Sequence, residues 1–321
     1  MPPPLSRPGH EVTALYGEEF AADPYAVYER LRRYGAPAPV ETAPGVGAML
    51  VLDHRAAPDL LHDPGTWSKD SRGWQDTVPA DSPVMPLLRH RFTPLSTDGE
   101  EHARYRKVIT DSFARLEPRR VREPVRDVSD GLLTRFAQRG RADLVGAYAR
   151  PLPPALPRPR LRPRPGRGRV ARAKGHAVFD SRQGVAEAAD SAYTHAVGQL
   201  YALKKSAPGQ DLASWSIDHP ERLTPDEAID QIALTFGAGC EPLAHLIGNA
   251  LSRMLVDDRY HSDLSGGALT ARDALRDVLR DEPPMANFSA HFPRRDVHFH
   301  GRRRGAGGPE DRAGPPPPPP G

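Results

Sequence analysis

The sequence predicts a mainly α-helical fold with a small β portion, and three observations carry that prediction. Residues 223–255 combine a helix start signal with an apolar residue at every third or fourth position. Shorter stretches before and after them show the same helical periodicity. Strand-like runs are few and short. A helical protein with a minor sheet satisfies all three observations.

The first 150 residues are predicted to be mostly helical. Asp23 is suited to cap a helix, Pro24 to occupy its first position, and Gly35 to end it. The apolar run GAMLVLD, residues 47–53, is bounded by a glycine-rich turn and an acid, so a strand is expected there. Residues 71–94 have the composition of a loop, with aromatic and apolar side chains suited to line a cavity. Further helices are expected at 54–63, 98–114 and 118–140.

Two blocks rich in proline and arginine, 151–174 and 301–321, interrupt this pattern. Closely spaced prolines remove amide donors and force extended backbone, so no packed structure is expected in either block. The first block carries seven arginines and one lysine without an acid, and the second carries four arginines against two acids. The whole chain is formally +3, so the remainder is acidic, which argues against a nucleic-acid-binding protein. The blocks separate residues 1–150 from 175–300, which are expected to be two parts of one domain.

The strongest helix signal begins at Thr224. Thr224 is the expected N-cap, Pro225 the first helical residue, and Glu227 completes a capping box. The middle of this helix contains Gly237-Ala238-Gly239 and then Pro242. Glycine has a low helix propensity and proline removes a backbone hydrogen bond, so the middle is expected to be a weak point beside a functional group.

The rest of the C-terminal half is also predicted to be helical until its last segment. A helix is expected within 173–209 and another within 269–284, where Thr270 and Asp273 form a capping pair. Residues 285–301 alternate in polarity and are expected to form a strand.

Cysteine usage and hydropathy predict the compartment. Cys240 is the only cysteine, which excludes a disulfide framework and suits a reducing cytoplasm. The N-terminus lacks the apolar stretch of a signal peptide, and no window approaches the roughly 18 to 20 apolar residues that span a bilayer. We therefore expect a cytoplasmic protein without a membrane partner.

Several of these motifs together resemble the soluble bacterial cytochromes P450, which are haem-thiolate monooxygenases. Residues 98–113, DGEEHARYRKVITDSF, are similar to the family's C helix, where a His-x-x-x-Arg pair binds the haem propionates. His102 and Arg106 match that pair. Positions i and i+4 share a helix face, and both side chains donate hydrogen bonds to carboxylates. A solvated helix face is the alternative explanation of this pair alone.

The segment FGAGCEP, residues 236–242, resembles the oxygen-binding kink of the family's long central helix, Ala/Gly-Gly-x-Glu/Asp-Thr-Thr. The resemblance implies that Ala238 and Gly239 let the haem and dioxygen approach the backbone. It also implies that Glu241 helps to deliver protons. Pro242 stands where the family has an alcohol, so proton delivery would need another donor or a water. A glycine-weakened buried helix is the alternative interpretation.

Residues 272–284 resemble the family's K helix, whose Glu-x-x-Arg motif stabilises the core. Asp277 and Arg280 give the best register, and Asp273 and Arg276 have the same spacing. Aspartate is one methylene shorter than the usual glutamate, so a looser ion pair is expected.

Two further segments extend the resemblance. His291 falls where the family usually has a propionate-binding arginine, five residues before Asp296. Residues 63–74, DPGTWSKDSRGW, match the approach to the family's substrate loop.

The expected fold is therefore P450-like and incomplete at the C-terminus. The family's iron is bound by a cysteine in a Phe-x-x-Gly-x-x-x-Cys-x-Gly loop after the K helix. Cys240 lies on the distal helix and is not expected to be that ligand. No such loop follows Gly301. Arginine, glycine, alanine and proline have GC-rich codons, so we interpret both blocks as the translation of a GC-rich gene in a shifted reading frame. The expected chain is therefore truncated before the ligand loop.

The resemblance implies a haem cofactor, a small apolar organic substrate and electrons from a ferredoxin-type partner. Because the axial cysteine is missing, activity of the chain as written is not expected. One alternative is a non-catalytic, frameshifted or truncated remnant of the family, and another is a Pro/Arg-rich module that binds RNA or polyproline-reading domains. A zinc site at His298, His300 and His291 is a further alternative, and surface histidines on a strand explain these residues better.

Overall fold

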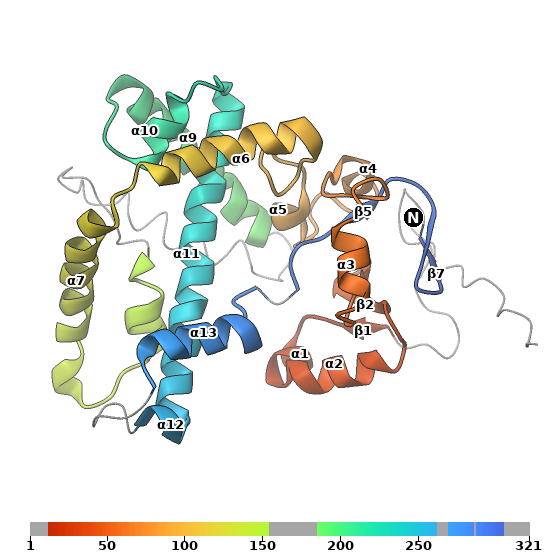
Figure 1. The fold of residues 1–321 in the computed structure, drawn as a ribbon, viewed down its shortest axis with the longest axis horizontal. Coiled ribbons are helices and arrows are strands. Elements are labelled where there is room, and N and C mark those ends of the chain that lie inside the picture. Colours follow the sequence, from red (N-terminus) through yellow and green to blue (C-terminus); the bar gives the residue numbers. More distant parts are fainter. Residues whose placement is uncertain (1–11, 154–184, 262–268, 286, 305–321) are drawn as a thin grey trace, which may run out of the picture. The chain divides into compact units, whose positions relative to one another are not determined.

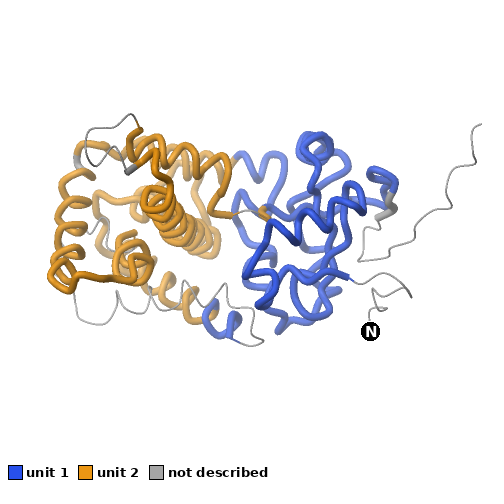
Figure 2. The backbone as a smooth tube through the Cα atoms, turned by 90° about the horizontal axis from the view of Figure 1, so that it is seen from below, with its two compact units in different colours: residues 1–103, 177–190, 289–321 blue, residues 104–176, 191–288 orange. Residues whose placement is uncertain are grey.

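The structure, a computed structural model, describes residues 12–153, 185–261, 269–285 and 287–304. The chain divides into two compact units, which Figure 2 distinguishes by colour. Unit 1 comprises residues 1–103, 177–190 and 289–321. Unit 2 comprises residues 104–176 and 191–288.

Unit 1 contains the small β portion. Strands β1 (Thr13–Ala14), β2 (Ala38–Ala43) and β3 (Val46–Leu50) form one sheet in that order, with β1 parallel and β3 antiparallel to β2. Helices α1 (Glu18–Ala22) and α2 (Pro24–Arg32), drawn in red and orange in Figure 1, belong to the same unit. Buried Val27 and Leu31 of α2 pack with Ala38 and Val40 of β2 into one apolar core. Burial of such side chains is the main favourable term for this sheet and helix.

The later elements of unit 1 join segments far apart in the sequence. Strand β4 (Trp67–Ser68) pairs with β5 (Phe292–Pro293), and β6 (Val297–Phe299) pairs with β7 (Arg302–Arg304). The rings of Trp67 and Phe299 meet edge to face at 5.2 Å between centroids, beside buried Ala56. Short helices complete this part of the unit: α3 (Ala56–Leu61), α4 (Arg72–Gln75) and α5 (Met85–Leu88).

Unit 2 is helical and centres on the long helix α11 (Pro225–Val256), drawn in cyan in Figure 1. Helix α13 (Ala271–Asp281) contacts α11, and buried Ile232 and Ala233 of α11 pack with Val197. The other elements are α7 (Pro118–Thr134), a 3₁₀ turn (Ala137–Arg139), a π-helical turn (Val145–Ala149), α10 (Leu212–Ile217) and α12 (Asp258–His261). Two helices have their first residues in unit 1 and the rest in unit 2, namely α6 (Gly99–Ala114) and α9 (Val185–Ser206).

The predicted helix starts are confirmed in detail. The Asp23 carboxylate accepts a hydrogen bond from the Ala26 amide at 2.9 Å, so it caps α2 as expected. Thr224 and Glu227 form the expected capping box of α11, and Thr270 and Asp273 form that of α13. These signals are reliable because each cap satisfies amides within its own first turn.

Three expectations need correction. Helix α11 runs unbroken through Pro242, where an interrupted middle was expected. Residues 71–94, expected to be a loop, contain α4 and α5. Arg302–Arg304 form β7, although no packed structure was expected from residue 301 onward. Pairing with β6 supplies backbone hydrogen bonds that composition alone does not reveal. The rest of that block, and residues 154–174 of the first block, lie outside the described residues.

None of the helices in the described ranges is both long enough and apolar enough to cross a membrane.

Candidate functional site

The middle of α11 presents an open apolar face. Ala238 and Gly239 are exposed, and no atom lies within 4 Å of the position that a Cβ on Gly239 would take. On the same side of the helix, Phe236 is 37% exposed and Leu243 is 36% exposed. A helix face with no side chain at its centre and apolar side chains beside it suits contact with a flat apolar group.

Pro242 changes the hydrogen bonding at this face. Proline has no amide hydrogen, so the Ala238 carbonyl receives no hydrogen bond from the residue four positions later. The neighbouring turns keep α11 continuous around this gap. An acceptor oxygen without its helical donor therefore lies beside Gly239, at the point where the resemblance implies oxygen binding.

Glu241 lies on another side of α11. It is only 7% exposed, and a two-residue step turns it by about 200° around the axis from Gly239. The carboxylate therefore faces the interior of unit 2 and does not lie on the open face. A buried acid placed this way reaches the open face only through other groups, and its role in proton delivery stays a prediction.

Cys240 is partly buried beside Glu241. Burial raises the pKa of its thiol to about 11, and the Glu241 carboxylate adds to that shift. The protonated thiol therefore dominates at neutral pH, and only the thiolate is a good nucleophile or metal ligand.

His102 and Arg106 lie four residues apart on α6, as predicted. The Nδ1–H of half-buried His102 donates a hydrogen bond to the Pro94 carbonyl at 2.9 Å, which leaves Nε2 for a second partner. Arg106 is exposed. His102 belongs to unit 1 and Arg106 to unit 2, because the boundary follows Ala103.

His291 belongs to unit 1 and is partly buried. Its Nδ1 hydrogen-bonds to the Ser289 carbonyl at 3.2 Å. Burial lowers the pKa of its imidazole below the ordinary value. A neutral imidazole is a weaker partner for a propionate than the arginine usual in the family.

The N-terminus of α11 is held by residues that sequence reasoning missed. Arg104 Nη1 and Nη2 donate to the two carboxylate oxygens of Glu227 at 2.7 and 3.0 Å. The buried Tyr105 hydroxyl donates to Glu227 Oε1 at 2.8 Å. Hydrogen bonding from Arg104 is the main reason that the pKa of Glu227 falls to about 2. Both residues lie inside the His102-to-Arg106 stretch, so the helix expected to bind the cofactor also anchors α11.

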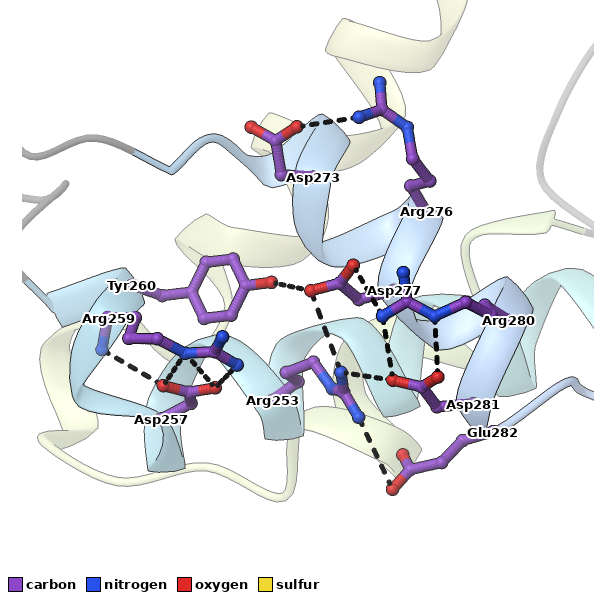
Figure 3. Close-up of polar contacts among 10 residues, drawn as sticks. All are labelled: Arg253, Asp257, Arg259, Tyr260, Asp273, Arg276, Asp277, Arg280, Asp281 and Glu282. Carbon is purple, nitrogen blue, oxygen red and sulfur yellow. Dashed lines mark hydrogen bonds and ion pairs between the residues drawn. The ribbon is translucent and has the colours of Figure 1, made fainter.

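Figure 3 shows a second polar cluster, where α13 meets the C-terminal end of α11. Arg280 Nη2 lies 3.3 Å from Asp277 Oδ1, and Arg276 Nη1 lies 3.3 Å from Asp273 Oδ1, so both candidate registers form an ion pair. Asp277 also accepts a hydrogen bond from the Tyr260 hydroxyl at 2.7 Å. Asp273 instead caps its own helix through Thr270. Only the Asp277 register therefore links α13 to another element.

Arg253 is the centre of that cluster and was not anticipated. Its guanidinium is 18% exposed and lies 3.1 Å from Asp281, 3.8 Å from Asp277 and 3.9 Å from Glu282. Arg280, the motif's arginine, is largely exposed and hydrogen-bonds mainly to Asp281 at 2.8 Å. Arg253 of α11 thus contacts carboxylates of α13 and of Glu282 at its C-terminal end.

The residues fit part of a haem and not its iron ligand. The open face at Ala238 and Gly239 suits the porphyrin plane, and His102 offers a donor for a propionate. The chain has one cysteine, its thiol is protonated, and it lies on the helix that bears the open face. These residues therefore supply no thiolate for the iron. Within the described ranges, no group of three or more His, Cys, Asp or Glu residues is suited to hold a metal ion, and His300 pairs with Asp59 at 3.0 Å.

Known proteins resemble the chain over most of its length. No protein-family model matches the sequence. The sequence is 29% identical to the cytochrome P450 monooxygenase PikC of Streptomyces venezuelae, over 89% of this chain and 69% of PikC. It is 27% identical to cytochrome P450 107B1 of Saccharopolyspora erythraea, over 88% of this chain and 72% of that protein.

Solved structures share the fold. CYP154C4 from Streptomyces sp. W2061 superposes with a TM-score of 0.79 and 21% identity, covering 93% of this chain and 75% of that one. CYP154A1 from Streptomyces coelicolor superposes with a TM-score of 0.71 and 25% identity, covering 91% and 75%.

Proposed function

Because the chain is a homologue of bacterial cytochromes P450 and has their mainly helical fold, we propose a function within haem monooxygenase chemistry. The substrate is a small apolar organic molecule, and a ferredoxin-type protein supplies the electrons. The cytoplasm is the proposed compartment, because a single protonated thiol suits a reducing environment. The open face of α11 is the observation that carries this proposal.

Each predicted site residue has a proposed role. Ala238 and Gly239 let the cofactor face approach α11, and the buried Glu241 holds a proton behind that face. His102, Arg106 and His291 bind the propionates. Asp277 and Arg280 stabilise the core, with Arg253 as their link to α11. Haem, when bound, supplies oxygen activation and substrate oxidation.

We further propose that residues 1–321 do not perform the oxidation by themselves. Thiolate ligation favours cleavage of the O–O bond in this family, and the one cysteine present is a poor thiolate on the wrong helix. The chain is therefore proposed to bind haem without supplying a thiolate ligand to its iron.

The test is the spectrum of the purified chain after haem addition, reduction and treatment with carbon monoxide. The expected result is bound haem without the thiolate-type Soret band. A thiolate-type band that disappears in Cys240→Ala would assign the ligand to Cys240 and overturn the second proposal. Absence of any haem binding would overturn the first. Translation of the gene in all three frames tests the frame interpretation, since it requires a Phe-Gly-Cys-Gly loop in another frame beyond codon 301.

A second candidate is a non-catalytic remnant of the family. It is favoured by large apolar side chains at the surface of unit 2, among them Leu279 at 56% and Val256 at 78% exposed. Each Å² left uncovered forfeits about 25 cal/mol, against a native stability of about 5–15 kcal/mol. Cooperative thermal unfolding of the purified chain would exclude the remnant, and a broad non-cooperative transition would support it.

A further inference from the structure

Polar side chains recur at every fourth residue along the C-terminal half of α11. They are Glu241, His245, Asn249 and Arg253, and a step of four residues keeps them on one side of the helix. Glu241 is buried and His245 is exposed. The row of polar side chains, called the stripe below, therefore places a solvent-exposed imidazole one helical turn from a buried acid.

Two members of the stripe bind the backbone that follows α13. Asn249 Nδ2 donates a hydrogen bond to the Glu282 carbonyl at 3.2 Å, and His245 Nδ1 lies 3.3 Å from the Pro284 carbonyl oxygen. A carbonyl oxygen only accepts hydrogen bonds, so Nδ1 of His245 carries a hydrogen. The other ring nitrogen, Nε2, is therefore the atom of His245 that gains and loses a proton.

Glu241 needs a proton source other than its neighbour in the sequence. Residue 242 is a proline and has no hydroxyl group to pass a proton to the carboxylate. The Cα–Cβ bonds of a helix tilt toward its N-terminus, so that of His245 is directed toward the turn that carries Glu241. Cβ atoms four residues apart lie about 5–6 Å from each other. One water, or a rotation of the imidazole, spans the remaining distance.

The charges around His245 divide into two groups. At the end of α13 the charged side chains are Asp277, Asp281 and Glu282. Arg253 lies within 4 Å of a carboxylate oxygen of each, so its guanidinium balances their charge. Glu241 is the acid of the stripe itself, one turn before His245. The stripe thus combines a fixed cation at one end with a group that exchanges protons beside the buried acid.

We propose that His245 is a relay residue that passes protons from solvent to Glu241. The Nε2–H bond of the imidazolium breaks, an O–H bond forms on the Glu241 carboxylate, and both groups become neutral. The exposed ring then takes a new proton from solvent. This role rests on the proposed function, in which Glu241 holds a proton behind the open face of α11. The transfer itself needs neither haem nor substrate.

A light-triggered fall in pH tests the relay on the full chain without haem. Infrared spectroscopy follows the carboxylic C=O band that appears when Glu241 takes up a proton, and Glu241→Gln identifies this band by removing it. In His245→Gln the band should appear roughly tenfold more slowly. Glutamine keeps a hydrogen-bond donor for the Pro284 carbonyl but does not carry a proton at neutral pH.

His195→Gln is the matched control. His195 is an exposed histidine of α9 in the same unit, and its Nε2 lies 3.0 Å from the side-chain amide of Gln199. The rate at which the Glu241 band appears should be unchanged in this variant. An equal slowing in His195→Gln would show that any exposed histidine of the unit affects the rate, and it would overturn the relay.

Added imidazole separates a proton relay from a structural contact. In His245→Ala, imidazole in the buffer should restore most of the lost rate, because position 245 is exposed and the free molecule carries the same proton. A slow rate that imidazole does not restore would show a structural role and overturn the proposal. An unchanged rate in His245→Gln, or the absence of a Glu241 band in the unaltered chain, would overturn it as well.

These measurements do not depend on the carbon monoxide spectrum. A chain that binds haem but protonates Glu241 at the same rate without His245 contradicts only the relay. A chain that shows the relay but binds no haem contradicts only the proposed function.

Discussion

Arg104 of α6 and Glu227 of α11 form a two-pronged ion pair at the start of the long helix, with atoms 2.7 and 3.0 Å apart. Glu227 at the same time closes the capping box with Thr224. The Glu227 carboxylate therefore accepts a hydrogen bond from the N-cap amide of α11. It also links this helix to α6, the helix that bears the predicted propionate pair.

Stability should depend on acid pH through Glu227. Its pKa is lowered from 4.5 to about 2, so its contribution is complete above about pH 4.5 and is lost as the pH falls toward 2. Glu227→Gln should lower the free energy of unfolding at pH 7 by about 1–3 kcal/mol and flatten its slope between pH 4.5 and 2. Urea unfolding at a series of pH values measures both, and an unchanged slope would contradict the assignment.

The two arginines near α13 should differ in importance. Arg253→Gln leaves three carboxylates near one another and should cost about 1–3 kcal/mol of unfolding free energy. Arg276→Gln breaks an exposed pair within one helix and should cost less than about 0.5 kcal/mol. Chemical denaturation compares them directly. Equal costs would show that the link between α11 and α13 does not depend on Arg253.

Pro242 should reduce the stability of α11. Pro242→Ala restores an amide donor for the Ala238 carbonyl and removes the ring from the helix interior, so the unfolding free energy should rise by about 1–3 kcal/mol. Differential scanning calorimetry gives the change in Tm. A lower Tm would mean that neighbouring packing requires the proline ring.

Cys240 should react slowly with alkylating reagents. With a thiol pKa of about 11, alkylation by iodoacetamide at pH 8 should be on the order of a hundredfold slower than for a free cysteine. The same chain in urea is the control and should react at the ordinary rate. Fast alkylation of the folded chain would indicate a thiolate and reopen the question of Cys240 as a ligand.

Prediction from sequence succeeded where a structural signal is local. The N-caps Asp23, Thr224 and Thr270 were all predicted, because each interacts with amides in its own first turn. The mainly helical class followed from the same periodicity. Strand β2 was missed, since its Pro39 is a poor strand residue and its stability comes from pairing with both neighbours.

For the candidate site, the sequence could predict only features that lie within a single helix. The position of Gly239 and Glu241 on different sides of one long helix could be predicted from the helical repeat, but which side is open and which is buried depends on packing. The role of Arg253 could not be predicted, because its partners lie on a different helix and at no regular spacing from it in the sequence.

Residue spacing alone thus determined the longer helices, the starts of α2, α11 and α13, and the order of motifs that resemble a haem-binding fold. Tertiary structure decided which charges meet: Arg104 reaches Glu227 across 123 positions of sequence, and Arg91 reaches Asp190 across 99. The physical reason is the sequence separation between interacting residues. A helix cap bonds to amides a few residues away, whereas ion pairs between elements form only after apolar burial has brought those elements together.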